Sequence, residues 1–152
     1  MPSTIPAVKK ALRNWLRLQS GLTPTDGVTI HGAPRAPTGA DTITLGRVVA
    51  PQTPPVMWPD VREETATLTG YVDIRRPGVD DAAEDAARDR AYALLAVLEA
   101  ALEADPTAGG VIPGPVKGLL TETELTEGEG DESEQAVRWA SIRWLLSWTS
   151  DY

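Results

Sequence analysis

The chain has 152 residues, 41% of them apolar, and a formal net charge of -8 from 14 basic and 22 acidic side chains, which predicts one domain over residues 1–152. It has no cysteine and one histidine, which excludes disulfides, thiolate metal sites, cysteine nucleophiles and any mechanism that needs two histidines. No apolar run approaches the roughly 18 residues of a membrane span, and the acidic excess opposes non-specific binding to DNA and to anionic membranes.

The first predicted element is an amphipathic helix that ends before Gly21. Its apolar side chains recur at helical spacing, at Ile5, Val8, Leu12, Trp15 and Leu16. On another face Lys9, Arg13 and Arg17 recur every four residues, and no acid precedes Gly21. Like charges at that spacing repel, so we expect something acidic to oppose them. Either this face is solvated beside the acidic body of the same chain, or it contacts a neighbouring copy.

Two short strands and a proline-rich segment are predicted next. Residues 28–31 and 42–49 have the composition of strands, whereas residues 51–59 contain four prolines, which exclude a helix and a central strand. Such a stiff segment would present Met57 and Trp58 to a partner at little cost in entropy. The alternative is a loop that folds back, with Trp58 covering the chain's own core.

Residues 63–75 alternate more regularly than any other segment. One face carries Ala66, Leu68, Gly70, Val72 and Ile74, and the other is mostly threonine. The pattern predicts a strand with one face on the core. Its threonine-rich face would meet solvent or the sheet of another subunit.

A long helix is predicted over residues 81–104, ended by Asp105 and Pro106. Asp81 and Glu84 have the spacing of a capping box, and further acids crowd this helix start, where the helix dipole favours negative charge. The apolar stripe that we expect to pack on the sheet consists of Ala87, Ala91, Leu94, Leu95, Leu98, Ala101 and Leu102.

The C-terminal part predicts a strand over 116–126, an acidic hairpin tip over 127–134 and a final strand over 136–149. A helix also suits the last segment, but its tryptophan, isoleucine, threonine and serine content favours a strand. At about 3.3 Å per residue it would span roughly 46 Å, so it bends or projects beyond its sheet. The predicted fold is therefore an α+β domain of order α-β-β-β-α-β-β, with two helices and a mainly antiparallel sheet.

Three tryptophans of the final strand, Trp139, Trp144 and Trp148, fall on both of its faces. A sheet with helices on one face cannot bury both faces by itself. Either one helix covers each face, or the subunit associates with copies of itself through these aromatic side chains.

The sequence contains no GxSxG or HExxH motif, no Walker-type loop before a helix and no complete dinucleotide-binding glycine pattern. His31 has no serine or acid beside it in the sequence, and the acidic tip lacks the ligand spacing of a calcium loop. We therefore expect no enzyme activity, no cofactor and no metal. Two other hypotheses remain open: an enzyme that uses His31 with Glu122 and Glu124, and a nucleic-acid adaptor that binds through the basic first helix.

The segments PSTIPAVKKALRNWL and REETATLTGYVDIRRPGVDDAAEDAARDRAYALLAVLEAAL, together with the long closing strand, resemble tail terminator (tail completion) proteins of long-tailed bacteriophages. The resemblance covers most of the chain in element order. It is carried by patterns such as YVDIRRPG before an alanine-rich helix. The proline-rich loop at Met57 and Trp58 and the tryptophan-rich C-terminus depart from the family pattern.

The resemblance implies an α/β subunit in the tail or neck of a virion, assembled in the host cytoplasm. Six copies would form a ring on the last ring of the tail tube, end tube polymerisation and dock the head connector or stopper. DNA would pass through the lumen without specific binding. The alternative role is a head–tail joining protein one layer nearer the capsid.

A closed ring needs two different, complementary surfaces on each subunit, and the basic first helix and acidic remainder offer a pair of opposite sign. The candidate interface residues are Lys9, Arg13, Arg17, Met57, Trp58, Trp139, Trp144 and Trp148. An acidic lumen would repel passing DNA. The candidate lumen residues are Glu127, Glu129, Asp131, Glu132, Asp80 and Asp81.

Overall fold

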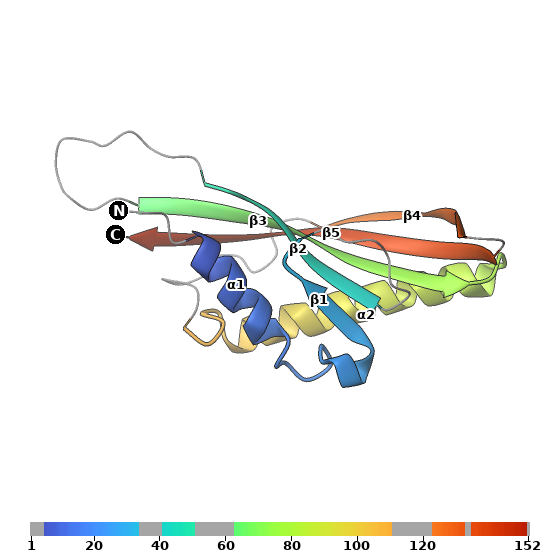
Figure 1. The fold of residues 1–152 in the computed structure, drawn as a ribbon, viewed down its shortest axis with the longest axis horizontal. Helices are drawn as coiled ribbons and strands as arrows, with labels where there is room; N and C mark the ends of the chain where they lie inside the picture. The colour runs from blue at the N-terminus through green and yellow to red at the C-terminus, as the bar shows by residue number, and fades with distance from the viewer. Residues whose placement is uncertain (1–4, 34–40, 51–62, 111–122, 133–134, 152) are drawn as a thin grey trace.

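The computed structural model describes residues 5–33, 41–50, 63–110, 123–132 and 135–151 (Figure 1). The elements are α1 (Ile5–Leu16), the short 3-10 helix η1 (Pro24–Asp26), β1 (Val28–His31), β2 (Asp41–Val49), β3 (Glu63–Pro77), α2 (Asp81–Ala104), β4 (Thr123–Glu132) and β5 (Gln135–Asp151). This order confirms the predicted α+β class. No helix in the described ranges is long and apolar enough to cross a membrane.

The five strands form one sheet in the order β1-β2-β3-β5-β4. All neighbouring strands are antiparallel except β1 and β2, which are parallel. The sheet is therefore mixed, with the antiparallel majority that the sequence predicts. Its centre is the pairing of β3 with β5, which runs without interruption from Glu63 opposite Asp151 to Pro77 opposite Val137.

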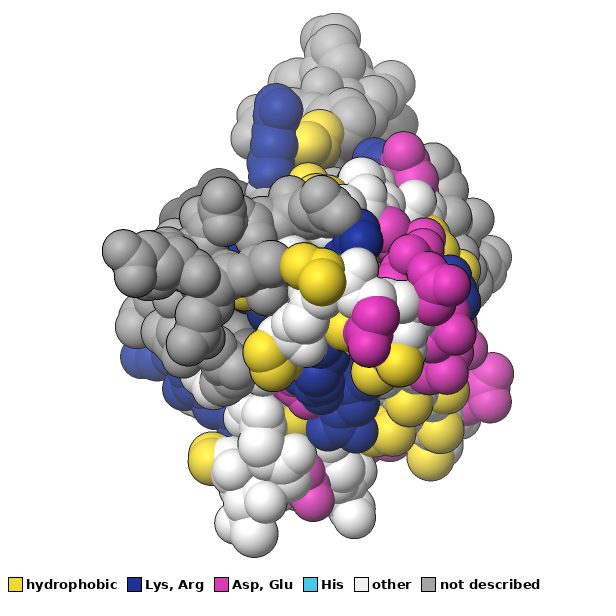
Figure 2. All heavy atoms as spheres, turned by 90° about the vertical axis from the view of Figure 1, so that its right-hand side faces the viewer, with side chains coloured by type: hydrophobic (Ala, Val, Ile, Leu, Met, Phe, Trp, Pro, Cys, Tyr) yellow, Lys and Arg dark blue, Asp and Glu magenta, His cyan; other side chains and the backbone are white. Residues whose placement is uncertain are grey.

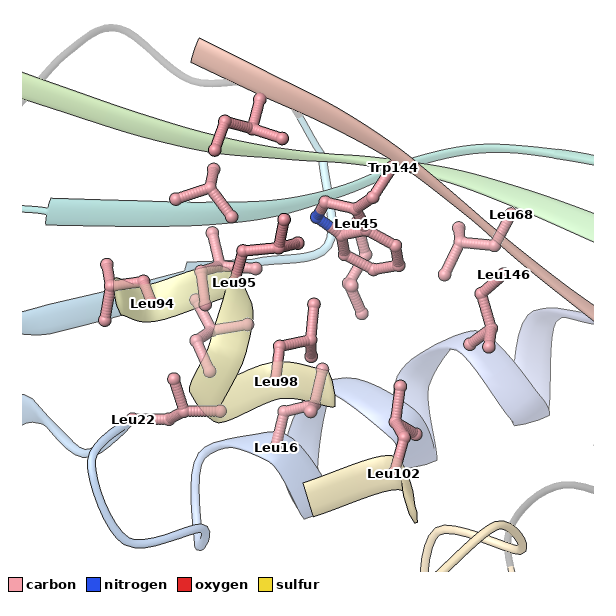
Figure 3. Packing of buried hydrophobic residues seen from close by; sticks show 14 of the residues in the cluster. Leu16, Leu22, Leu45, Leu68, Leu94, Leu95, Leu98, Leu102, Trp144 and Leu146 are labelled. Atoms are coloured by element: carbon pink, nitrogen blue, oxygen red, sulfur yellow. The ribbon is translucent and has the colours of Figure 1, made fainter. Parts of the chain in front are cut away.

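Both helices lie on the same face of the sheet (Figure 1). One continuous core joins Leu12 of α1 and Leu98 of α2 to Leu68 and Trp144 of the sheet (Figure 3). The alternative in which one helix covers each face is wrong. The chain after α1 turns directly onto α2, since a Cβ at Gly21 would lie 3.1 Å from Cγ1 of Val97.

The strand predictions for residues 63–75 and 136–149 are confirmed, with longer observed bounds. Ala66, Leu68, Val72 and Ile74 are buried on the helix side of β3, as the alternation predicts. Within the described residues β4 pairs with β5 only as far as Trp144, and β5 continues to Asp151 beside β3 alone. The final strand thus extends past the described part of β4 but stays paired with β3 to Asp151, so the expected projection beyond the sheet is wrong.

The predicted acidic hairpin is confirmed, because β4 pairs with β5 up to Glu132 opposite Gln135, but its tip does not extend over 127–134. Residues 127–132 continue β4, and Gly128 pairs with Trp139 of β5. This glycine indicates a turn in the sequence, but its missing side chain leaves room for the indole: a Cβ at Gly128 would lie 2.6 Å from Cζ2 of Trp139. Residues 116–122 of the predicted strand, and residues 133–134, lie outside the described ranges.

The start of α2 differs by one residue from the predicted capping box. Asp80, not Asp81, is the N-cap, and its Oδ1 accepts a hydrogen bond from the backbone N–H of Ala83 at 3.0 Å. The predicted apolar stripe of α2 is buried except for Ala101, which is half-buried. Ala83, which lies outside the predicted stripe, is buried as well. α2 therefore lies along the sheet through alanines in its first half and leucines in its second.

Candidate assembly surfaces

Four cations lie on α1 or directly after it, here called the basic surface: Lys10 and Arg17 are exposed, and Lys9 and Arg13 are half-buried. None of them forms an ion pair with an acid of the described residues. The Arg17 guanidinium donates to the backbone oxygen of Ile30 at 2.6 and 3.2 Å. A neutral carbonyl fixes this side chain without neutralising it, so the basic surface keeps its positive charge.

The surroundings of Arg13 and Lys9 also leave their charges without an acidic partner among the described residues. The Arg13 guanidinium donates to Oδ1 of the adjacent Asn14 at 3.4 Å, again a neutral acceptor. Lys9 lies at the border of the core, and this partial burial lowers the pKa of its ammonium group. The sequence predicts that something acidic opposes these cations, and within the described part of one subunit nothing does.

The opposite charge gathers on the first half of α2. Asp81, Asp85 and Asp89 recur every four residues and are exposed; they are called the acidic stripe here. Figure 2 looks at the end of the molecule where α2 begins and shows acidic side chains gathered along one side.

One cation, Arg88, stands beside the acidic stripe. It binds Asp85 of its own helix and reaches Oε1 of Glu127 on β4 at 3.3 Å. The charge of Glu127, followed by the hydrogen bond to Asp85 and the charge of Asp85, raises the pKa of Arg88. The helix start therefore remains acidic, since Arg88 compensates only part of its charge.

The predicted lumen residues fall into three groups. Asp80 caps α2 through its side chain, and Asp81 begins the acidic stripe. Glu127 points to the helix side of the sheet and binds Arg88. Glu129, Asp131 and Glu132 belong to β4 by their backbone, and their side chains lie outside the described set.

The tryptophans divide between the two faces of β5. Trp144 is 0% exposed and Trp148 is 2% exposed, so the prediction that they form a partner interface is wrong. Every second residue of β5 faces the helices, and both helices cover that face. Trp139 faces the other side, is half-buried and covers Gly128. Met57 and Trp58 lie outside the described residues.

The second face of the sheet has no described helix over it. Its β3 and β5 side chains are half-buried: Thr67, Thr69, Tyr71, Asp73, Ser141, Arg143, Leu145 and Ser147. The hydroxyl groups of Thr67 and Ser147 lie 3.1 Å apart, and Arg143 donates to Oε2 of Glu124 at 3.1 Å. The threonine-rich face is thus a patterned polar surface outside the core, as predicted.

A buried carboxylate that sequence reasoning missed ties three elements together. Asp41, at the start of β2, accepts from Arg76 of β3 at 2.8 and 3.2 Å and from Arg90 of α2 at 2.8 Å. Burial alone would raise the pKa of Asp41, but the hydrogen bonds and charges of the two arginines outweigh it and the pKa is lowered. No motif brings residues 41, 76 and 90 together, so only the fold reveals this cluster.

The residues of the alternative enzyme hypothesis are not brought together. His31 lies on β1 and Glu124 on β4, the two edge strands of the sheet. With strands about 4.8 Å apart, four spacings separate them by roughly 19 Å. Glu122 lies outside the described residues, and within them no three histidine or acidic side chains are grouped as a metal site would require.

No model of a known protein family matches the chain, and no curated protein sequence matches it. Solved structures do match, and one is a chain described as "Virion of native gene transfer agent (GTA) particle". The two are 14% identical, the match covers 97% of this chain and 100% of that one, and the TM-score is 0.49.

Proposed function

We propose that this chain is a structural subunit of a phage-like virion that assembles into a ring, of six copies in the family it resembles. The ring would cap the head-proximal end of a tail tube, end tube polymerisation and offer a docking surface to the head connector. The observation that carries the proposal is the pair of oppositely charged helix surfaces: within the described residues the basic one has no acidic partner, and the acidic one is compensated only in part, by Arg88.

The distance between the two surfaces explains why they do not neutralise each other within one subunit. α1 packs at the C-terminal end of α2, where a Cβ at Gly109 would lie 3.0 Å from Cδ1 of Trp15. The acidic stripe begins at Asp81 and ends at Asp89, 16 and 8 residues before Val97, which is about 24 and 12 Å along a helix. Opposite charges at separate places on one subunit favour a head-to-tail contact between copies, and such contacts generate rings when the rotation closes.

The family resemblance supports the place of this ring in a virion. It is carried by the order of the elements and by segments such as YVDIRRPG at the end of β3. The acids of β4, Glu127, Glu129, Asp131 and Glu132, remain our candidates for a lumen lining, since negative charge would keep passing DNA from binding. No covalent chemistry is part of the proposed role.

The test uses the particle that the chain would belong to. Electron microscopy of the purified chain should show closed rings, and gold-labelled antibody should mark the junction of tail and head. Deletion of the gene should give tubes of uncontrolled length, which the wild-type gene restores to one length.

Two other outcomes would count against this role. Label that stays on tailless heads, with tube length unchanged by the deletion, would favour the head–tail joining role. Absence of label from the particle would overturn the virion proposal altogether.

A further inference from the structure

Three cations of the basic surface have the same spacing along the chain as the three acids of the acidic stripe. The cations Lys9 and Arg13 of α1 and Arg17, which follows α1 and donates its backbone N–H to the Arg13 carbonyl, stand four residues apart. On α2 the acids Asp81, Asp85 and Asp89 do the same. Each set of three therefore spans eight residues, or about 12 Å of helix. Two helices laid side by side could match all three charges, with the middle pair, Arg13 and Asp85, opposed in either direction. Asp85 would then lie between two cations, Arg88 of its own helix and Arg13 of the next copy.

Exposed apolar side chains adjoin both sets. Among the described residues four large hydrophobic side chains are exposed, and three stand beside the stripes: Leu18 at 80%, Val79 at 64% and Tyr92 at 46%. Leu18 follows Arg17, whereas Val79 and Tyr92 flank the acidic stripe at its two ends. A single exposed apolar residue is ordinary. Their gathering at these two surfaces indicates a contact that buries them.

We infer that three cations of the basic surface of one copy, Lys9, Arg13 and Arg17 (called the basic stripe), pack against the acidic stripe of the next copy. This inference rests on the proposed ring and names the two surfaces that join its subunits. It assigns Asp81 to the subunit interface rather than to the lumen. Each copy uses each stripe once, which is the heterologous contact that a closed ring requires.

The direction of the two helices follows from their dipoles and from the apolar neighbours. Neighbouring helix dipoles attract when the helices are antiparallel. That direction sets Arg17 opposite Asp81 and brings Leu18 to Val79. The parallel direction would set Arg17 opposite Asp89 and bring Leu18 to Tyr92. Charge pairs at such a contact fix partner and register, and the apolar side chains add buried area.

Charge reversal tests the pairing. Arg13→Asp and Asp85→Arg, each alone, should raise the protein concentration at half-assembly by about tenfold or more, measured by sedimentation velocity at low salt. The two substitutions in one chain should restore assembly, and so should a 1:1 mixture of the two single variants. Arg47→Asp on β2 and Glu103→Arg at the end of α2 make the same charge changes at exposed positions and should assemble as wild type.

A second measurement covers variants that fold poorly. The chain has no cysteine, so an Arg13→Cys chain and an Asp85→Cys chain can be mixed and joined by a short bis-maleimide. The contact predicts crosslinks between the two kinds of chain. It predicts few between like chains.

The outcomes separate this inference from the proposed ring. If both single reversals assemble as wild type, the stripes are not the contact, and the ring stands on another surface. If the wild-type chain stays monomeric at every concentration, both fail. Rescue of Arg17→Asp by Asp81→Arg supports the antiparallel direction, and rescue by Asp89→Arg instead overturns it.

Discussion

The indole of Trp144 on β5 occupies the space above Gly70, its cross-strand partner on β3. A Cβ at residue 70 would lie 2.2 Å from Cζ2 of that ring. Glycine ordinarily weakens a strand because it brings no side chain to pack. Here a fully buried tryptophan covers the bare backbone, so the pair acts as one packing unit.

Gly70→Ala should therefore be destabilising although alanine is small. The new methyl group has no free space, and overpacking of this kind costs about 1–3 kcal/mol; we expect the upper half of that range. Urea unfolding at a salt concentration that keeps the chain monomeric measures the effect. Thr69→Ala, at the neighbouring position on the polar face, is the matched control. A free energy of unfolding within about 0.5 kcal/mol of wild type would contradict the packing described.

Trp144→Ala and Trp144→Phe should differ strongly. Loss of the whole ring system leaves a cavity and should cost about 3–5 kcal/mol. Nε1 of Trp144 is buried and has no hydrogen-bond partner among the described residues. Phenylalanine removes this N–H, and an unpaired buried donor costs about 1–3 kcal/mol. Circular dichroism during denaturation should place the phenylalanine variant within about 1.5 kcal/mol of wild type, and equal losses would show that the N–H is paired.

Asp41→Asn should destabilise the chain in a pH-dependent way. The substitution leaves Arg76 and Arg90 without their shared carboxylate, and removing one partner of a buried pair costs about 3–5 kcal/mol. Both arginines are about a third exposed, so we expect about 2–3 kcal/mol at neutral pH.

The sign of the pH dependence follows from the lowered pKa of Asp41. Its contribution is fully present above the unfolded-state pKa of about 3.9. It is lost as the pH falls through the lower pKa of the folded state. The stability difference between wild type and Asp41→Asn should thus be constant near neutrality and shrink below about pH 4. Glu103→Gln, an exposed change on α2, should show no such gap, and a gap for Asp41→Asn that grows on acidification would refute the assignment.

Asp80→Ala should cost more than Asp81→Ala. Asp80 is the N-cap of α2, and replacing such a residue by alanine typically costs about 1 kcal/mol. Asp81 lies within the first turn and contributes through the helix dipole, worth about 0.3–1 kcal/mol. Thermal unfolding of the two variants side by side measures the order. A larger loss of stability for Asp81→Ala than for Asp80→Ala would favour the capping box that the sequence predicts from Asp81 and Glu84.

The elements that the sequence predicts well are those with one buried face. The alternation in β3 and the stripe of α2 are visible because every second residue, or every third and fourth, enters the same core. The sheet order and the shared face of the two helices depend on contacts between distant segments. The packing of Gly21 on Val97 is one of them, and no local pattern carries it.

The candidate surfaces show the same division. The sequence predicts the basic stripe because its residues recur every four positions within one short segment. The interface predicted for Trp144 and Trp148 is wrong because composition alone does not say which strand face the helices cover. Gly128 indicates a turn in the sequence, but in the fold it lies within β4 because Trp139 occupies the space of its missing side chain. The cluster around Asp41 unites three distant positions, and it becomes visible only in the fold.

The uninterrupted ladder between β3 and β5 has a mechanical consequence. All 15 residues of β3 pair with β5, and the two strands run along the length of the subunit (Figure 1). A pull applied to the two ends of the subunit would load these rungs in shear, so that many must fail together rather than unzip singly. The subunit is thereby expected to resist stretching most strongly along these two strands.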